Sequence, residues 1–323
     1  MADLFSVAEI IEITGGRARN ISAESVFSVS IDSRTLEPGA LFVAIKGERF
    51  DGHDYVAGAI RNGAAVALVS KQRGGEFGKL PVLVVPDALE GLGQLGVAAR
   101  ARSGAKIAAI TGSVGKTTVK EMVRSILSRA GKTHASIRSY NNHWGVPLML
   151  AGLPKAAEFG VFEIGMNHAG EITPLSNMVC PHVTLITNIG SAHIGNFKNM
   201  EGIARAKGEI FSGMVPGGAA IVNGDHAYVE ILRELAEKAG VRRFVTYGFD
   251  SNADIVLSGV QAGAAGSTAR VGLAGGNISL DVSMPGRHML ANALGALCVG
   301  EELGVDTEVS LAAIAEFSAP AGR

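Results

Sequence analysis

Cysteines, excess charge and long apolar runs are scarce in this 323-residue sequence. Its two cysteines, Cys180 and Cys298, lie far apart and outside any Cys-x-x-Cys spacing, which favours a reduced cytoplasmic setting over a disulfide framework. Lysine and arginine number 29 against 30 acidic residues, so the formal net charge is -1, and a nucleic-acid platform or a polybasic membrane surface is disfavoured. No run approaches the roughly 18 apolar residues of a membrane span, and the amino terminus does not read as a signal peptide. We therefore expect a soluble, monomeric protein of the cytoplasm that neither binds nucleic acid nor inserts into a membrane.

The chain is long enough for about two domains, each with its own core. Residues 1–104 predict a small mixed domain of short strands and helices. Residues 105–323 predict an α/β domain, because apolar strands alternate with helical stretches, as is typical of a mostly parallel sheet covered by helices on both faces. Near residues 254–284 short alternating runs predict antiparallel hairpins at the edge of that sheet.

A strand, a glycine loop and a helix follow one another between Lys106 and Gly131. Backbone N–H groups of such a loop and of a helix N-terminus point at a bound anion, so the segment predicts a polyphosphate site. The general pattern has a further glycine where this chain has Ile110, and a plain glycine-rich turn between core elements is the alternative. The residues expected to contact the phosphates are Gly112, Ser113, Val114, Gly115, Lys116, Thr117 and Thr118.

Residues of this loop and of two strand ends predict a magnesium site. Lys116 would reach the β- and γ-phosphates, and the Thr117 hydroxyl would bind Mg²⁺. Glu163 ends an apolar strand, where a carboxylate is well placed to hold the same ion. His193 follows the next strand in the same way. A glutamate that points into water and a purely structural histidine are the alternatives.

Lys207 lies on the apolar face of a helix expected over residues 201–214. A lysine in an apolar stripe must extend its amine to water, pair with an acid or lose its charge. A neutral amine can react with carbon dioxide to give a carbamate, an anion that is able to bind metal. The sequence alone does not separate these outcomes.

Three further polar segments are candidates for ligand contacts. Ser33 and Arg34 follow a strand, and they either hold a phosphate or sugar or are solvated turn residues. Asn141 and Asn142 lie in the loop with the only tryptophan, which either faces a substrate or forms a simple turn. Asn292, in a helix, faces either a ligand or solvent.

Taken together, these segments resemble the Mur ligases of bacterial cell-wall synthesis, and among them those that add a D-alanyl-D-alanine dipeptide. The resemblance covers nearly the whole chain, and this family uses the shorter phosphate loop seen here. The motifs that carry it are DSRTLEPGALFVAIKGERFDGHDY, TGSVGKTTVKEM, NNHWGVPL, FEIGMNHAGEI, TNIGSAHIGNFKNMEGIARAKGEIF and GRHMLANALGAL.

The resemblance implies ATP-dependent joining of D-alanyl-D-alanine to UDP-N-acetylmuramoyl-tripeptide through an acyl phosphate, in cytoplasmic peptidoglycan precursor synthesis. It implies that residues 1–104 bind the UDP-sugar precursor and that residues 105–323 bind ATP with two Mg²⁺ ions. Whether the third residue of the tripeptide is diaminopimelate or lysine stays open.

The resemblance also assigns roles to individual residues. It implies catalytic roles for Lys116, His193 and Lys207, the last matching a lysine that the family carries as a carbamate. The implied metal ligands are Thr117, Glu163, His193 and Lys207. Asn292 and Arg323 match positions on the adenosine side of ATP, whereas Ser33, Arg34, Asn141 and Asn142 match positions that meet the precursor.

Members of this family continue into a third domain that brings the dipeptide. Because the chain ends where that domain would begin, we expect a truncated protein that binds nucleotide loosely and ligates poorly. A non-catalytic module that binds nucleotide and UDP-sugar, and a generic P-loop NTPase, are the alternatives.

Overall fold

The computed structural model describes residues 3–137, 140–273 and 276–318. Contacts divide the chain into two compact units, the first made of Met1–Ser103 with Pro147–Lys155 and the second of Gly104–Val146 with Ala156–Arg323. The segment Pro147–Lys155 therefore groups with the first unit, although the sequence analysis assigned it to the second domain. Which ligand each unit binds stays a prediction.

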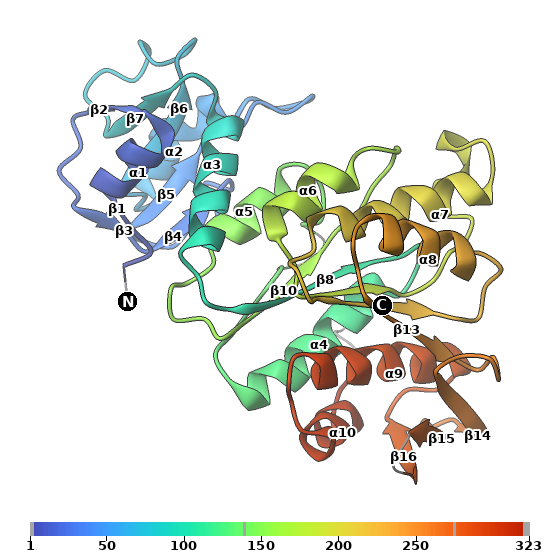
Figure 1. Cartoon of the computed structure of the whole chain (residues 1–323). Helices are drawn as coiled ribbons and strands as arrows, with labels where there is room; N and C mark the ends of the chain where they lie inside the picture. Colours follow the sequence, from blue (N-terminus) through green and yellow to red (C-terminus); the bar gives the residue numbers. More distant parts are fainter. Residues whose placement is uncertain (1–2, 138–139, 274–275, 319–323) are drawn as a thin grey trace. The chain divides into compact units, whose positions relative to one another are not determined.

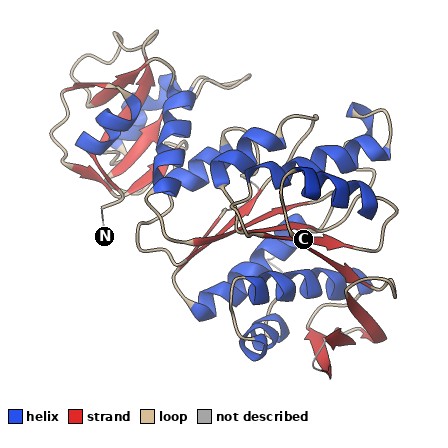
Figure 2. Cartoon of the chain, in the orientation of Figure 1, coloured by secondary structure: helices blue, strands red, loops and turns tan. Residues whose placement is uncertain are grey.

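The first unit is a small sheet with helices packed against it (Figure 2). Its elements are β1 (Phe5–Ser6), α1 (Val7–Thr14), β2 (Arg17–Arg19), β3 (Ser25–Val26), β4 (Ser28–Ser30), β5 (Ala40–Val43), η1 (Gly52–Tyr55), α2 (Val56–Arg61), β6 (Val66–Ser70), β7 (Val82–Val85) and α3 (Ala88–Ala101). The main sheet has the order β2-β7-β6-β5-β4, and β1 pairs with β3 separately. Strands β4 to β7 run parallel, so their carboxyl ends share one edge.

Local capping explains where two helices of this unit begin. Ser6 and Glu9 form a capping box at the start of α1, in which Glu9 N–H donates to Ser6 Oγ at 3.1 Å and Ser6 N–H donates to the Glu9 carboxylate at 2.7 Å. The same helix ends at Gly15, whose φ of 62° is left-handed. Asp87 caps α3 by accepting hydrogen bonds from the backbone of Leu89 and Glu90.

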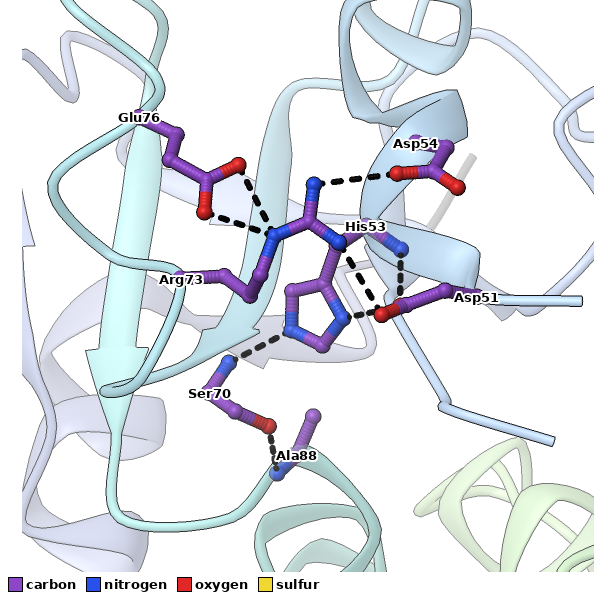
Figure 3. Close-up of polar contacts among 7 residues, drawn as sticks. All are labelled: Asp51, His53, Asp54, Ser70, Arg73, Glu76 and Ala88. Atoms are coloured by element: carbon purple, nitrogen blue, oxygen red, sulfur yellow. Dashed lines mark hydrogen bonds and ion pairs between the residues drawn. The ribbon is translucent and has the colours of Figure 1, made fainter.

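A buried histidine joins three segments at the carboxyl edge of this sheet (Figure 3). His53 is 4% exposed. Its Nδ1 lies 2.6 Å from an Asp51 carboxylate oxygen, and its Nε2 accepts a 2.9 Å hydrogen bond from the Ser70 backbone. Because Nε2 is an acceptor, the ring is neutral and carries its proton on Nδ1. The Ser70 hydroxyl in turn accepts from the Ala88 backbone at the start of α3.

An arginine extends this network to three carboxylates (Figure 3). Arg73 donates to Asp51 at 3.0 Å, to Asp54 at 2.9 Å and to Glu76 at 2.7 Å. The loops that follow β5 and β6 are therefore cross-linked by charge-assisted hydrogen bonds.

The second unit is built on a nine-stranded sheet in the order β16-β15-β14-β13-β12-β11-β8-β10-β9. Its strands are β8 (Lys106–Thr111), β9 (Thr133–Ala135), β10 (Phe159–Glu163), β11 (Val183–Ile186), β12 (Ala219–Asn223), β13 (Arg243–Gly248), β14 (Ile255–Gly263), β15 (Gly266–Leu273) and β16 (Gly276–Val282). Its helices are α4 (Lys116–Ala130), α6 (Ile172–Val179), η2 (Ile194–Asn196), α7 (Met200–Gly208), η3 (Glu209–Gly213), α8 (Val229–Lys238), α9 (Arg287–Glu302) and α10 (Thr307–Ala315), and α5 (Gly145–Ala151) crosses from the second unit into the first.

Helices cover both faces of the large sheet. Figure 1 shows α6, α7 and α8 on one side of it and α4, α9 and α10 on the other. All neighbouring strands between β9 at one edge of the sheet and β14 pair in parallel. At the other edge, β14 pairs with β15 and β15 pairs with β16, both antiparallel. The expected α/β class, with a mostly parallel sheet and an antiparallel edge, is confirmed.

The helix after the glycine loop, α4, buries one apolar face. Val119, Met122, Val123, Ile126 and Leu127 are all fully buried. Within the described ranges, no helix combines the length and the apolar character needed to cross a membrane.

Candidate active site

The glycine loop between β8 and α4 adopts a conformation that only glycine fits at two positions. Gly112 has φ 149° and Gly115 has φ 83°, and a left-handed φ strains any residue with a side chain. A Cβ atom at Gly112 would collide with Oγ1 of Thr187, and one at Gly115 would lie 2.8 Å from Oδ1 of Asn292. Asn292 thus lies directly against the loop, and its role towards a ligand stays a prediction.

The loop after β11 is hydrogen-bonded to the glycine loop. Ser113 N–H donates to the Asn188 carbonyl at 3.1 Å, and its hydroxyl donates to the Gly190 carbonyl at 2.9 Å. Val114 N–H donates to Asn188 Oδ1 at 3.2 Å, and the Thr187 hydroxyl donates to the Val114 carbonyl at 2.6 Å. These contacts fix the loop before any anion binds, which favours a preorganised site.

Lys116 opens helix α4 with its amine folded back onto the loop. Its Nζ donates to the Gly112 carbonyl at 2.8 Å. Burial lowers the pKa of Lys116 below its usual value, whereas the nearby charge of Glu163 acts in the opposite direction. A cation that is partly desolvated in this way binds an anionic phosphate more strongly than an exposed lysine does.

Glu163, at the end of β10, points into the protein rather than into water. It is 1% exposed. One carboxylate oxygen accepts from the Thr117 hydroxyl at 2.8 Å, and the other accepts from the Asn141 amide at 2.7 Å. Asn142 has a different contact, since its Oδ1 accepts from the Gly145 backbone at the start of α5.

Lys207 and His193 complete a cluster of basic groups around the same site. Lys207 is 2% exposed, and burial, followed by the charge of Lys116, lowers its pKa to about 7. The pKa of His193 is lowered by burial and by the charges of Lys207 and Lys116, against an opposing effect of Glu171. Basic groups that disfavour one another's protonation are complemented by an anionic ligand.

A cavity of about 1210 Å³ adjoins the glycine loop. On its wall the Arg287 guanidinium lies 4.0 Å from the centre of the Phe249 ring. Asp225 accepts hydrogen bonds from the backbone of Phe249 and Asp250 at 2.7 and 2.9 Å, which fixes the turn after β13. The residues that line this cavity include Val114, Gly115, Thr118, Asn188, Asn223, Asp225, Phe249, Arg287 and Asn292.

Several of these residues were not identified from the sequence. Asn188, Asp225 and Phe249 follow the ends of β11, β12 and β13, and the carboxyl ends of parallel strands are where ligands bind. Their positions just after predicted strands could therefore have identified these three residues as candidates. Arg287 stands at the first position of α9, and the sequence offers no signal for its ring contact.

The remaining candidates lie elsewhere or outside the described residues. Ser33 and Arg34 follow β4 in the first unit, where Arg34 donates to the Asp32 carboxylate at 2.8 and 2.9 Å. The Ser33 carbonyl accepts from the Asn62 amide at 2.7 Å. Their expected contact with a precursor stays a prediction. Arg323 lies outside the described residues.

The residues present at the loop fit a hard divalent cation. A hydroxyl and a buried carboxylate, as in Thr117 and Glu163, are oxygen ligands of the kind that Mg²⁺ prefers. In the described part of the chain no group of three or more His, Cys, Asp or Glu side chains is arranged to hold a metal ion by itself. Mg²⁺ is commonly held by one or two protein oxygens together with water and the oxygens of a bound phosphate.

Comparison with known proteins links this geometry to one family. Residues 110–300 match the Mur ligase middle domain, and residues 25–100 match the Mur ligase family catalytic domain. The chain is 34% identical to the UDP-N-acetylmuramoyl-tripeptide–D-alanyl-D-alanine ligase of Escherichia coli K12, covering 98% of the chain and 69% of that protein. It is 33% identical to the Bacillus subtilis protein of the same name, covering 94% of the chain and 65% of that protein.

Solved structures give the same result. The chain is similar to MurF from Acinetobacter baumannii, with a TM-score of 0.88 and 34% identity over 99% of the chain and 69% of that structure. It is also similar to MurF from Thermotoga maritima in complex with ADP, with a TM-score of 0.77 and 26% identity over 92% of the chain and 67% of that structure.

Proposed function

The chain belongs to the Mur ligase family, and from this premise we propose that its second unit carries the ATP-dependent site of a D-alanyl-D-alanine-adding ligase. The substrates would be UDP-N-acetylmuramoyl-tripeptide, D-alanyl-D-alanine and ATP, in cytoplasmic synthesis of the peptidoglycan precursor. The observation that carries the proposal is the buried contact of Thr117 and Asn141 with Glu163. It joins the phosphate loop, a strand-end carboxylate and the NNHWGVPL loop in one site.

ATP would bind along the glycine loop. The backbone N–H groups of Gly112–Thr118 and the start of α4 would hold the phosphates, with Lys116 on the group that is transferred. The adenosine would occupy the adjoining cavity, against Asn292. Contact of Gly115 with Asn292 supports this arrangement, because one residue would touch both the nucleoside and the loop.

Two Mg²⁺ ions are expected with the nucleotide. Thr117 and Glu163 would hold one of them, and His193 with Lys207 in its carbamate form would help to hold the other. When bound, these ions would neutralise the negative charge of the phosphates. A lysine whose pKa is about 7 supports the carbamate, because a substantial share of the amine is neutral at physiological pH.

The reaction requires activation, since a carboxylate oxygen is a poor leaving group. The terminal carboxylate of the tripeptide would attack the γ-phosphorus, forming a new P–O bond while the bond to ADP breaks. The amine of the dipeptide would then attack the acyl phosphate and release inorganic phosphate. Lys116 would offset the charge that develops on the transferred group. Both first-step reactants are anions, and the charge of Lys116 together with that of the two bound ions would offset their repulsion.

Different segments of the chain would contact different parts of the precursor. Ser33 and Arg34 would meet its UDP-sugar, and Asn141 and Asn142 would lie nearer its peptide. The Arg34 side chain is 83% exposed and pairs with Asp32 at 2.8 Å, and a guanidinium at the surface can bind an anionic group of a ligand, which supports this assignment.

The test is ADP release by the 323-residue chain with each substrate present and absent. Release that depends on both the tripeptide precursor and D-alanyl-D-alanine, and that is lost in Lys116→Ala, supports the ligase. Release without the precursor would instead support a generic NTPase. Calorimetric binding of precursor and nucleotide without turnover would support the binding module. Slow turnover by this chain, which matches 65 to 69% of the two ligases named above, stays a prediction that the same assay measures.

A further inference from the structure

Glu209 binds the segment that follows the Glu163 strand, although it lies only two residues beyond Lys207. Its Oε1 accepts from the Gly170 backbone at 2.6 Å. Its Oε2 accepts from the backbone of Ile172 and Thr173 at 3.1 and 3.2 Å, and from the Thr173 hydroxyl at 3.3 Å. One carboxylate thus accepts four hydrogen bonds from a segment more than 35 residues away in sequence.

This carboxylate acts as the cap of helix α6. The first N–H groups of a helix have no partner within it, and Glu171 at the N-cap position makes no side-chain capping bond. The Glu171 carboxylate instead accepts from the Asn167 backbone at 2.7 Å, inside the preceding loop. A negative charge at a helix N-terminus is also favoured by the helix dipole. The start of α6 therefore depends on a residue of η3.

Two close contacts seat α6 on η3. The Ser176 hydroxyl donates to the Ile210 carbonyl at 2.5 Å, and both groups are buried. A Cβ atom at Gly213 would collide with the Ser176 backbone, so the two segments touch at backbone distance. Asn196, in the loop after β11, donates through its amide to the Asn167 carbonyl at 3.1 Å. The loop that follows Glu163 is thereby hydrogen-bonded both to the segment after His193 and to the segment after Lys207.

We propose that Glu209 is a positioning residue, which fixes the loop after Glu163 against the segment that carries Lys207. The inference rests on the proposed function, because Glu163 and Lys207 must face the same phosphate for their separation to affect turnover. Glu209 itself touches no reacting group. Its effect is on geometry, so it should appear in kcat rather than in the KM for ATP, whose binding loop is held separately by Asn188.

Glu209→Ala in the full 323-residue chain tests both parts of this inference. Hydrogen exchange should become at least about tenfold faster at the amides of Gly170, Ile172 and Thr173, because they lose their acceptor. The kcat for ADP release should fall about 10- to 100-fold, as for other residues that orient ligands indirectly. The KM for ATP should stay within about twofold of the wild-type value.

Glu209→Gln separates the two oxygens of the carboxylate. Its amide oxygen can face Ile172 and Thr173, but its NH₂ group cannot accept from Gly170. Protection should therefore return at Ile172 and Thr173 and remain lost at Gly170, with a kcat between those of the wild type and Glu209→Ala. Glu201→Ala is the matched control, because Glu201 lies in the neighbouring helix α7 and binds only Arg205 among the described residues.

Two results would overturn the proposal. Unchanged exchange at all three amides in Glu209→Ala would show that the cap is absent in solution. Faster exchange with a kcat equal to that of Glu201→Ala would reduce Glu209 to a purely structural cap. If the wild-type chain itself released no ADP in response to both substrates, the proposed function would fail and the positioning role with it, while the exchange data would still establish whether the cap exists.

Discussion

The Thr117 hydroxyl donates a 2.8 Å hydrogen bond to the Glu163 carboxylate across 46 positions of sequence. Thr117 lies in the first turn of α4, which follows β8, and Glu163 ends β10. Strands β8 and β10 are neighbours in the sheet, and Glu163 pairs with Ile110 at the last step of their ladder. Both oxygens of the carboxylate are engaged, since Asn141 occupies the second. A buried acid is therefore held at a fixed place beside the glycine loop by hydrogen bonds from a hydroxyl and an amide.

Glu163→Gln should abolish most turnover while leaving the fold intact. The amide keeps the shape and an acceptor for Thr117, but its NH₂ group cannot accept from Asn141, so the free energy of unfolding should fall by about 1–3 kcal/mol and the protein should stay folded. Loss of the charge should lower kcat for ADP release about 100- to 1000-fold, as when a preorganised electrostatic group is removed. Glu230→Gln is the control, because that side chain is 80% exposed. A kcat within about tenfold of the wild type would contradict the assigned role.

Gly115→Ala should weaken nucleotide binding. The left-handed φ of 83° costs a non-glycine residue about 1–2 kcal/mol, and the new methyl group would press on Asn292. We expect the calorimetric Kd for an ATP analogue to rise at least about tenfold. Gly104→Ala is a matched control, since a Cβ atom there meets nothing within 4 Å. Equal affinities of the two variants would show that the loop does not bind the nucleotide.

Asp51→Ala should destabilise the first unit in a pH-dependent way. Burial alone would raise the pKa of Asp51, but hydrogen bonds from the backbone and side chain of His53 and the charge of Arg73 lower it overall. A depressed carboxyl pKa contributes stability above the unfolded pKa of about 3.9, and this contribution is lost as the pH falls further towards the folded pKa.

Urea unfolding at two pH values measures this effect. At pH 7 the variant should lose about 1–3 kcal/mol relative to the wild type, because its partners stay buried without an acceptor. At about pH 3 the difference should be smaller. Glu37→Ala, at an exposed position, should show neither effect. A loss that is equal at both pH values would mean that the charge of Asp51 is not what stabilises the network.

Local patterns in the sequence were sufficient for the phosphate loop and the sheet. The glycine spacing indicated Gly112 and Gly115. The buried face of α4 follows the spacing of its apolar residues, although Ala130, which continues that spacing, is exposed where the helix ends. The burial of Lys120, in the same helix, was not predicted. This lysine is fully buried, and its amine donates to the Ser136 carbonyl at 2.7 Å. A partner 16 positions away leaves no trace in the periodicity.

The helix expected over residues 201–214 is in fact two elements. Helix α7 ends at Gly208, and the chain continues as the 3₁₀ helix η3. At the junction a Cβ on Gly208 would meet the Leu235 side chain at 2.5 Å, so close packing against α8 accompanies the change. Apolar spacing cannot distinguish these two helix types over a few residues. It also gave no sign that Glu209 caps a distant helix, because that contact depends on tertiary structure alone.

The lowered pKa of Lys207 makes the stability of the folded chain depend on pH. Burial and Lys116 lower this pKa to about 7, against about 10.4 in an unfolded chain. Between these values the unfolded chain holds a proton that the folded chain lacks, so this group makes stability rise as the pH rises from about 7 to 10.4, with no dependence on pH below that window.

Carbamate formation should follow the same titration, because only the neutral amine attacks carbon dioxide. With ¹³C-bicarbonate, the carbamate signal in the NMR spectrum should grow as the pH is raised through about 7 and should be absent in Lys207→Ala. That variant should lose ADP release and partly regain it with added short carboxylic acids, which supply the missing anion. Lys198→Ala, at an exposed position, should keep both signal and turnover. A Lys207→Ala protein that folds normally but is not rescued at any acid concentration would argue that Lys207 acts as a plain amine.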